Sequence, residues 1–196
     1  MLITLETPSS RMNAHPAPEN PGNAAVKSVA GPVGDMTDDP PNSAEEIDDL
    51  GRFLQNYIDE NHEFLSWIGT SVEDVDNGTM TLSIPYDEKL TNIRPNAGPD
   101  QRPDIHGGIA ATLIDTVGGF AIQTQLEEPL STGVATINLN VNYLRPATGD
   151  LEATAEVVRA GSTVGVSEVT VESTTPDGET KAVATGQGSY RIFRED

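Results

Sequence analysis

Residues 106–126 read HGGIAATLIDTVGGFAIQTQL, and the rest of the chain must be arranged around this stretch. The spacing predicts a helix over 108–125, and apolar residues occupy nearly every face of it. A helix that is apolar all round is normally buried, so this one has to be covered on most sides. Asp115 is the one charged residue in it. Because a carboxylate is almost never fully buried unless it is paired or in use, Asp115 is a candidate functional residue.

The predicted helix begins with two glycines that follow a histidine, His106-Gly107-Gly108. Free backbone N–H groups at a helix N-terminus attract negative charge, and they can hold a carbonyl oxygen as it becomes an oxyanion. The glycines have a plainer interpretation as turn residues, and His106 has one as a helix cap or packing residue. Their place before a long buried helix favours the oxyanion interpretation for the glycines, and we expect a positioning role for His106.

Two helical segments are predicted near the start of the folded part. The capping-box sequence SAEE at 43–46 precedes apolar residues that are three or four apart, which predicts an amphipathic helix over about 44–60. A short helical turn is expected after it, with Phe64, Leu65 and Ile68 facing inward.

In the remaining segments, apolar and polar residues alternate as they do in β-strands. Asp76-Asn77-Gly78 is a tight-turn sequence and predicts a hairpin. Further strands are expected after the helix, joined by short turns that favour antiparallel pairing; they cover 136–143, 151–159, 164–173 and 180–193. Two strands before the helix and four after it predict an α+β fold, with an antiparallel sheet wrapped around a long central helix. The row Asn138, Asn140 and Asn142 is interpreted as a solvated or interface-facing strand edge.

The charge of the chain narrows its possible partners. The 196 residues include 31 Asp and Glu against 11 Lys and Arg, a net charge of −20. The acidic residues are spread along the chain, which favours the solvated surface of a halophilic protein, because molar salt screens self-repulsion. The alternative is a protein that binds cations or basic partners. The chain has no basic patch, which argues against nucleic-acid binding.

Composition also limits cofactors and location. The absence of cysteine excludes disulfides, thiolate metal sites and a cysteine nucleophile. Three scattered histidines have no metal-ligand spacing, so we expect neither a metal nor another cofactor. No secretion signal and no apolar run of about 20 residues is present, so a cytoplasmic location and no membrane partner are expected. Residues 1–42 are rich in Pro, Gly, Ala, Asn and Ser and are predicted to be a disordered extension.

Two stretches carry a resemblance to a known family. The stretch from His106 to Asp115, and NLNVNYLRPA at 138–147, resemble the hotdog-fold thioesterases of the phenylacetate-pathway (PaaI-like) type. The order of elements agrees, and the resemblance covers about 45–195. We therefore predict a hotdog domain over 43–196. The resemblance implies a homodimer or homotetramer that hydrolyses acyl-CoA at the subunit interface.

The resemblance also implies roles for single residues. The backbone N–H of Gly107 donates to the thioester carbonyl, and His106 helps to place the loop and the substrate. Asp115 acts as nucleophile or as general base on water, and Thr136 matches the Ser or Thr that assists it. Gly108 is expected to contact the substrate.

One position departs from the family pattern. The family often has an asparagine six residues before the histidine, where this chain has Asp100. Asn96 lies four residues further back, and we expect it to contribute to substrate binding if the proline-rich loop shifts the register.

Other functions and contacts stay open at this stage. Four arginines, any of which could meet CoA phosphates, are each interpreted first as surface ion pairs; they are Arg94, Arg102, Arg145 and Arg159. A non-catalytic protein that binds or senses acyl-CoA is the main alternative to the thioesterase, and a hydratase of enoyl thioesters ranks last.

Overall fold

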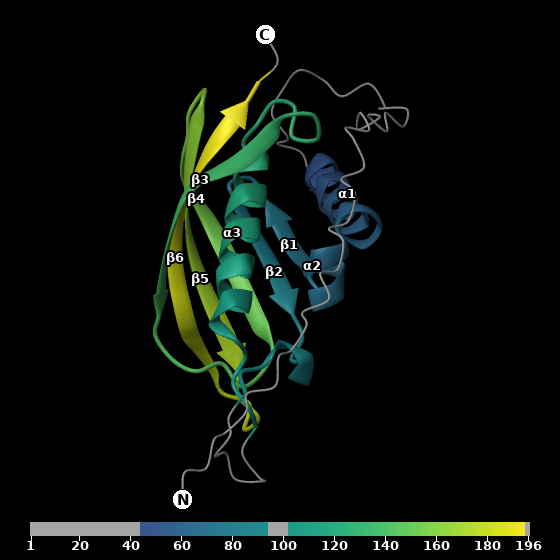
Figure 1. Cartoon of the computed structure of the whole chain (residues 1–196). Helices are drawn as coiled ribbons and strands as arrows, with labels where there is room; N and C mark the ends of the chain where they lie inside the picture. The colour runs from purple at the N-terminus through teal and green to yellow at the C-terminus, as the bar shows by residue number, and fades with distance from the viewer. Residues whose placement is uncertain (1–43, 94–101, 195–196) are drawn as a thin grey trace, which may run out of the picture. The chain divides into compact units, whose positions relative to one another are not determined.

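A six-stranded antiparallel sheet forms the frame of the computed structural model, which describes residues 44–93 and 102–194 (Figure 1). The strands follow the alternating segments of the sequence: β1 (Ser71–Asp76), β2 (Thr79–Ile84), β3 (Gly133–Tyr143), β4 (Leu151–Ala160), β5 (Val164–Thr174) and β6 (Thr180–Phe193). Their order in the sheet is β1-β2-β4-β5-β6-β3, so within the described ranges β3 pairs with β6 alone and forms an edge.

The long helix α3 (Gly107–Gln123) lies along one face of this sheet and contacts β2 to β6 (Figure 1). Its sheet-facing side is fully buried and includes Leu113, Ile114 and Val117. The opposite stripe, which includes Ala111, Asp115 and Gly119, is only half-buried. In a single chain the helix is therefore covered on one side rather than on most sides, although its sequence is apolar nearly all round.

Glycines allow α3 to approach the sheet closely. A Cβ at Gly186 of β6 would lie 3.2 Å from Ile114 Cδ1 and nearer still to another carbon of that side chain. A Cβ at Gly118 of α3 would lie 2.6 Å from Ser167 Oγ and would overlap the hydroxyl of Tyr190. The contact between helix and sheet depends on these small residues, because the interior has no space for another methyl group there.

Two helices before the sheet complete the core. Helix α1 (Ala44–Asn61) packs on β1 and buries Leu50, Leu54 and Ile58, as its spacing predicts. Helix α2 (Glu63–Ile68) follows and buries Leu65 and Ile68. The prediction was wrong for Phe64, which is 48% exposed, because its neighbours Leu65 and Ile68 share the core-facing side of this one-turn helix.

The sequence predicts the remaining elements closely. The hairpin of β1 and β2 turns at Asn77 and Gly78, and the φ of 84° at Gly78 is in the left-handed region that glycine adopts readily. The strands after α3 begin and end near the predicted residues, and all pair antiparallel. In the described part of the chain, no helix is both long enough and apolar enough to cross a membrane.

Two neighbouring glycines of α3 test the close packing of helix on sheet. We expect Gly118→Ala to lower the free energy of unfolding by about 1–3 kcal/mol, because its Cβ overlaps the Tyr190 hydroxyl. Gly119→Ala is the matched control, because its Cβ would lie 3.4 Å from Tyr190 Cε1, and alanine favours a helix over glycine by about 1 kcal/mol. Denaturant unfolding in molar KCl measures both, and equal loss of stability in the two variants would contradict this packing.

Candidate active site on helix α3

The segment before α3 is held from two sides. The Ile105 N–H donates to the Ala147 carbonyl at 2.8 Å, and the His106 N–H donates to the Leu90 carbonyl at 2.8 Å. A bridge between Thr91 and Ile105 adds a second contact with the segment that follows the short 3-10 helix η1 (Glu88–Leu90). These backbone bonds fix where the chain enters the helix.

His106 is the N-cap of α3. Its Nδ1 accepts a hydrogen bond from the Gly108 N–H at 2.9 Å. A Cβ at Gly108 would lie 2.9 Å from the same nitrogen, which explains why a glycine follows here. His62 caps α2 in the same way, through the Leu65 N–H at 3.3 Å. The structure thus shows His106 as a helix cap, the plainer interpretation considered from the sequence, and its role in placing the substrate stays a prediction.

Gly107 has a different environment. Its carbonyl accepts a hydrogen bond from the Tyr143 hydroxyl at 3.1 Å, and a Cβ on it would lie 3.0 Å from the Tyr143 ring. Among the described residues we find no acceptor for the Gly107 N–H. The first N–H of the helix therefore remains available at the positive end of the helix dipole.

A cleft of about 370 Å³ opens beside this helix start. It is lined by His106 and Gly107, by Tyr143 and by the residues that follow β3, including Arg145. Arg145 is exposed, and its Nη1 donates to the Ala182 carbonyl at 2.8 Å. No carboxylate in the described ranges forms an ion pair with it, in contrast to the surface ion pair considered from the sequence.

Asp115 lies two turns further along α3 and is half-buried. Its Oδ1 accepts a hydrogen bond from Thr136 Oγ1 at 2.7 Å. No Lys, Arg or His of the described residues forms an ion pair with Asp115. The structure thus brings together two residues that the sequence singled out, and it leaves the second carboxylate oxygen of Asp115 without a partner in that part of the chain.

A β-bulge in β3 turns Thr136 toward Asp115. The register with β6 shifts between Thr136 and Asn138, so Ile137 is an extra residue in the strand. Strict alternation would place Thr136 on the same face as Asn138; the bulge instead leaves Ile137 58% exposed and lets Thr136 reach α3. Bulges beside functional sites commonly re-aim one side chain in this way.

The two halves of the predicted site lie apart within one chain. Eight residues separate Gly107 from Asp115 on α3, which corresponds to about 12 Å along the axis. Asp115 and Thr136 do not line the cleft that contains His106 and Gly107. One chain therefore does not bring the Gly107 N–H and the Asp115 carboxylate to the same reacting atom.

Other sequence candidates lie elsewhere. Asn96, Asp100 and Arg94 lie outside the described residues. Arg102 lies over the Tyr86 ring, 3.5 Å from its centroid, and Arg159 is an exposed residue of β4.

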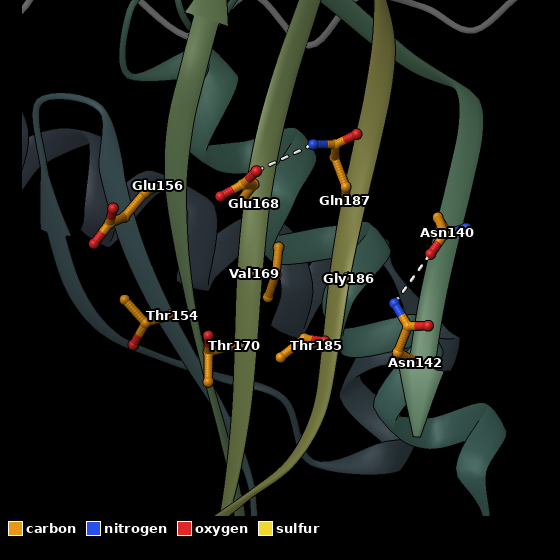
Figure 2. A pocket seen from close by; sticks show the side chains of 10 residues that line it. All are labelled: Asn140, Asn142, Thr154, Glu156, Glu168, Val169, Thr170, Thr185, Gly186 and Gln187. Carbon is orange, nitrogen blue, oxygen red and sulfur yellow. Dashed lines mark hydrogen bonds between the residues drawn. The ribbon is translucent and has the colours of Figure 1, made fainter. Parts of the chain in front are cut away.

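A second hollow, of about 460 Å³, lies on the sheet face opposite α3 (Figure 2). Hydrogen bonds join Gln187 to Glu168 and Asn142 to Asn140 across its floor, both at 3.2 Å. None of the predicted catalytic residues lines it. The asparagine row of β3 therefore belongs to a polar surface of the sheet, as the sequence indicated.

Two tyrosines near the site were missed by the sequence analysis. Tyr143 contacts Gly107, and Tyr190 donates from its hydroxyl to the Asp115 backbone carbonyl at 3.2 Å. The signal for Tyr190 is present in the sequence: the pairs Gly118-Gly119 and Gly186/Gly188 weaken a helix and a strand unless something packs closely there.

Comparison with known proteins identifies the family of the chain. The sequence model of the thioesterase superfamily matches residues 103–179. A protein of Halobacterium salinarum named "Putative esterase" is 54% identical over 153 residues, which cover 77% of this chain and 97% of that protein. The chain belongs to the thioesterase superfamily. The Halobacterium relative also supports a halophilic origin for the acidic composition.

Solved structures of this superfamily share the fold. A thioesterase family protein from Silicibacter pomeroyi has a TM-score of 0.63 at 27% identity, covering 76% of this chain and 99% of that one. The PaaI protein of the E. coli phenylacetic acid degradation operon has a TM-score of 0.58 at 19% identity, covering 76% and 96%. The predicted hotdog fold of this thioesterase-superfamily chain, with its sheet and central helix, is confirmed.

The cap at His106 can be tested by stability alone. We expect His106→Ala to lower the free energy of unfolding by about 1 kcal/mol, because the Gly108 N–H loses its acceptor. His106→Asn is expected to retain most of that stability, because asparagine caps a helix through its own side-chain oxygen. Denaturant unfolding in molar KCl compares the two, and an alanine variant as stable as the asparagine variant would argue against the cap.

Proposed function

We propose that this protein hydrolyses acyl-CoA thioesters to a free carboxylic acid and CoA. The observation that carries the proposal is the pair formed by Asp115 and Thr136, since a half-buried carboxylate is held at 2.7 Å by a hydroxyl that a bulge directs toward it. The Gly107 N–H at the start of the same helix supplies a donor of the kind that stabilises an oxyanion.

Asp115 is suited to acid–base or nucleophilic work. In the water route, the free carboxylate oxygen takes a proton from water as the water oxygen bonds to the thioester carbonyl carbon. The Gly107 N–H stabilises the resulting oxyanion, the C–S bond breaks, and the proton passes from Asp115 to the leaving CoA sulfur. In the direct route, Asp115 attacks the carbonyl carbon itself, the C–S bond breaks and CoA leaves as a thiolate that takes a proton from solvent. Water then hydrolyses the mixed anhydride to the free carboxylic acid and regenerates the Asp115 carboxylate. Thr136 orients the carboxylate in both routes.

The separation along α3 supports a site shared by two copies of the chain. An oxyanion donor and a base each have to lie about 3 Å from the atoms they act on, whereas Gly107 and Asp115 of one chain are about 12 Å apart along the axis. The half-buried stripe of α3 and the unpaired edge of β3, with its exposed Ile137, are surfaces that a second copy can cover. We therefore propose a homo-oligomer in which Gly107 of one subunit and Asp115 of another meet at one thioester.

The position of Arg145 supports the proposal that the thiol part of the thioester substrate is CoA. It lies at the cleft beside Gly107, and in a chain with a net charge of −20 it has no carboxylate partner among the described residues. An arginine without a carboxylate partner in the described ranges, on an otherwise acidic protein, suits the phosphates of CoA.

Substitution of Asp115 tests the reaction. We expect Asp115→Asn to lower kcat for thiol release from acyl-CoA by about 10²- to 10⁴-fold, because the amide can neither take the proton nor attack. Thr136→Val is expected to lower kcat by about tenfold through loss of the 2.7 Å hydrogen bond. Thr154→Val, on the far face of the sheet and hydrogen-bonded to Thr81, is the matched control. Thiol release from a panel of acyl-CoAs in molar KCl is the measurement.

The same experiment separates the alternative function. Full activity in Asp115→Asn would overturn the assignment of this residue. Acyl-CoA binding without thiol release, by a folded and oligomeric wild-type protein, would point to the binding or sensing protein.

Substitution of Arg145 tests whether the thiol part of the substrate is CoA. We expect Arg145→Ala to raise KM for acyl-CoA by about tenfold while kcat changes little, because a phosphate contact contributes to binding in both the ground state and the transition state. Arg52→Ala is the control, since this exposed arginine of α1 pairs with Asp49 and does not line the cleft. An acyl-pantetheine thioester lacks the nucleotide, so its KM should be the same in wild type and Arg145→Ala. A shift of equal size for both substrates would contradict a phosphate contact.

A further inference from the structure

Tyr190 lies beneath Asp115 on the sheet side of α3. It is 1% exposed, and its hydroxyl donates a hydrogen bond to the Asp115 backbone carbonyl at 3.2 Å. In the register of β3 and β6, Tyr190 is the direct cross-strand partner of Thr136. Adjacent strands therefore contact the same aspartate twice, at its carboxylate through Thr136 and at its main chain through Tyr190.

The phenol is enclosed by residues that leave it no alternative position. A Cβ at Gly118 of α3 or at Gly188 of β6 would overlap the Tyr190 hydroxyl oxygen. Ser167 of β5 is fully buried. Its Oγ is near the Tyr190 hydroxyl, since the same Cβ at Gly118 would lie 2.6 Å from Ser167 Oγ. Two glycines and a serine thus form a slot that has the size of this hydroxyl, at the point where the helix is nearest to the sheet.

The buried hydroxyl remains a donor at any ordinary pH. The pKa of Tyr190 is raised to about 12, chiefly by burial; a hydrogen bond with Ser167 lowers it in part, and the negative charge of Asp115 adds to the increase. A protonated phenol donates, and the carbonyl of Asp115 accepts.

We infer that Tyr190 is a positioning residue for the reaction, which fixes the main chain at Asp115 so that its carboxylate meets both Thr136 and the substrate. The inference rests on the proposed function of Asp115. The hydroxyl itself is enclosed beneath the helix and contacts no substrate, so Tyr190 acts through Asp115. A bulged strand supplies one contact and a buried tyrosine on the neighbouring strand supplies the other. Together they hold Asp115, with which no Lys, Arg or His of the described residues forms an ion pair.

Tyr190→Phe removes one oxygen atom and keeps the ring in its slot. We expect kcat for thiol release to fall by about tenfold or more, with KM within about twofold of wild type, because a small misplacement of a reacting group lowers the rate of the chemical step. Tyr86→Phe is the matched control: its hydroxyl donates to the Pro103 carbonyl at 3.0 Å and contacts neither Asp115 nor Thr136. Denaturant midpoints establish that both variants are folded.

A double-variant cycle separates positioning from a general structural effect. In the Asp115→Asn background, Tyr190→Phe is expected to change the residual rate by less than about twofold, because the group it positions is already inactive. A kcat of Tyr190→Phe equal to that of wild type would overturn the inference, and so would an equal loss in both backgrounds.

A wild-type protein that releases no thiol would overturn the proposed function, and crystal structures then test the inference by geometry. In Tyr190→Phe, the Asp115 carboxylate should move away from Thr136, beyond their 2.7 Å hydrogen bond. An unchanged Asp115–Thr136 pair in that variant would overturn the positioning role whatever the activity.

Discussion

The close packing of α3 on the sheet is the constraint on which the rest of the structure depends. The helix is apolar, so burying its sheet-facing side provides much of the stabilisation, and small residues let it lie near β5 and β6. Gly118 and Gly188 leave room for the Tyr190 hydroxyl and for nothing larger. Because packed interiors transmit displacement, the height of the helix above the sheet also sets where Asp115 lies.

The two groups proposed to take part in the reaction, the Gly107 N–H and the Asp115 carboxylate, are held in place by different kinds of hydrogen bond. At the helix start, backbone hydrogen bonds to Leu90 and Ala147 and the cap by His106 fix the position of the Gly107 N–H. At Asp115, side chains from two paired strands hold the group. Backbone bonds suit a donor that has to stay in one place. A carboxylate with one oxygen bonded and one free can exchange a proton or bond to carbon.

The acidic composition gives the cleft at the helix start an unusual electrostatic setting. In a protein of net charge −20, most of the surface repels the phosphates of a substrate such as CoA. Arg145 lines this cleft, and no carboxylate of the described residues forms an ion pair with it. Molar salt shortens the range of the repulsion to about 3 Å, so contacts at hydrogen-bond distance retain their strength while the distant charges are screened.

The sequence by itself determined the helices, the strands and their antiparallel pairing, and it singled out His106, Gly107 and Asp115. These features depend on local periodicity, on turn residues and on the chemistry of single side chains. Only the tertiary structure decided that Thr136 reaches Asp115, because the bulge at Ile137 breaks an alternation that is regular in the sequence. It alone also placed the Tyr190 hydroxyl under a carbonyl 75 residues away. Contacts of that kind follow from how closely a helix packs on a sheet, which no short stretch of sequence specifies.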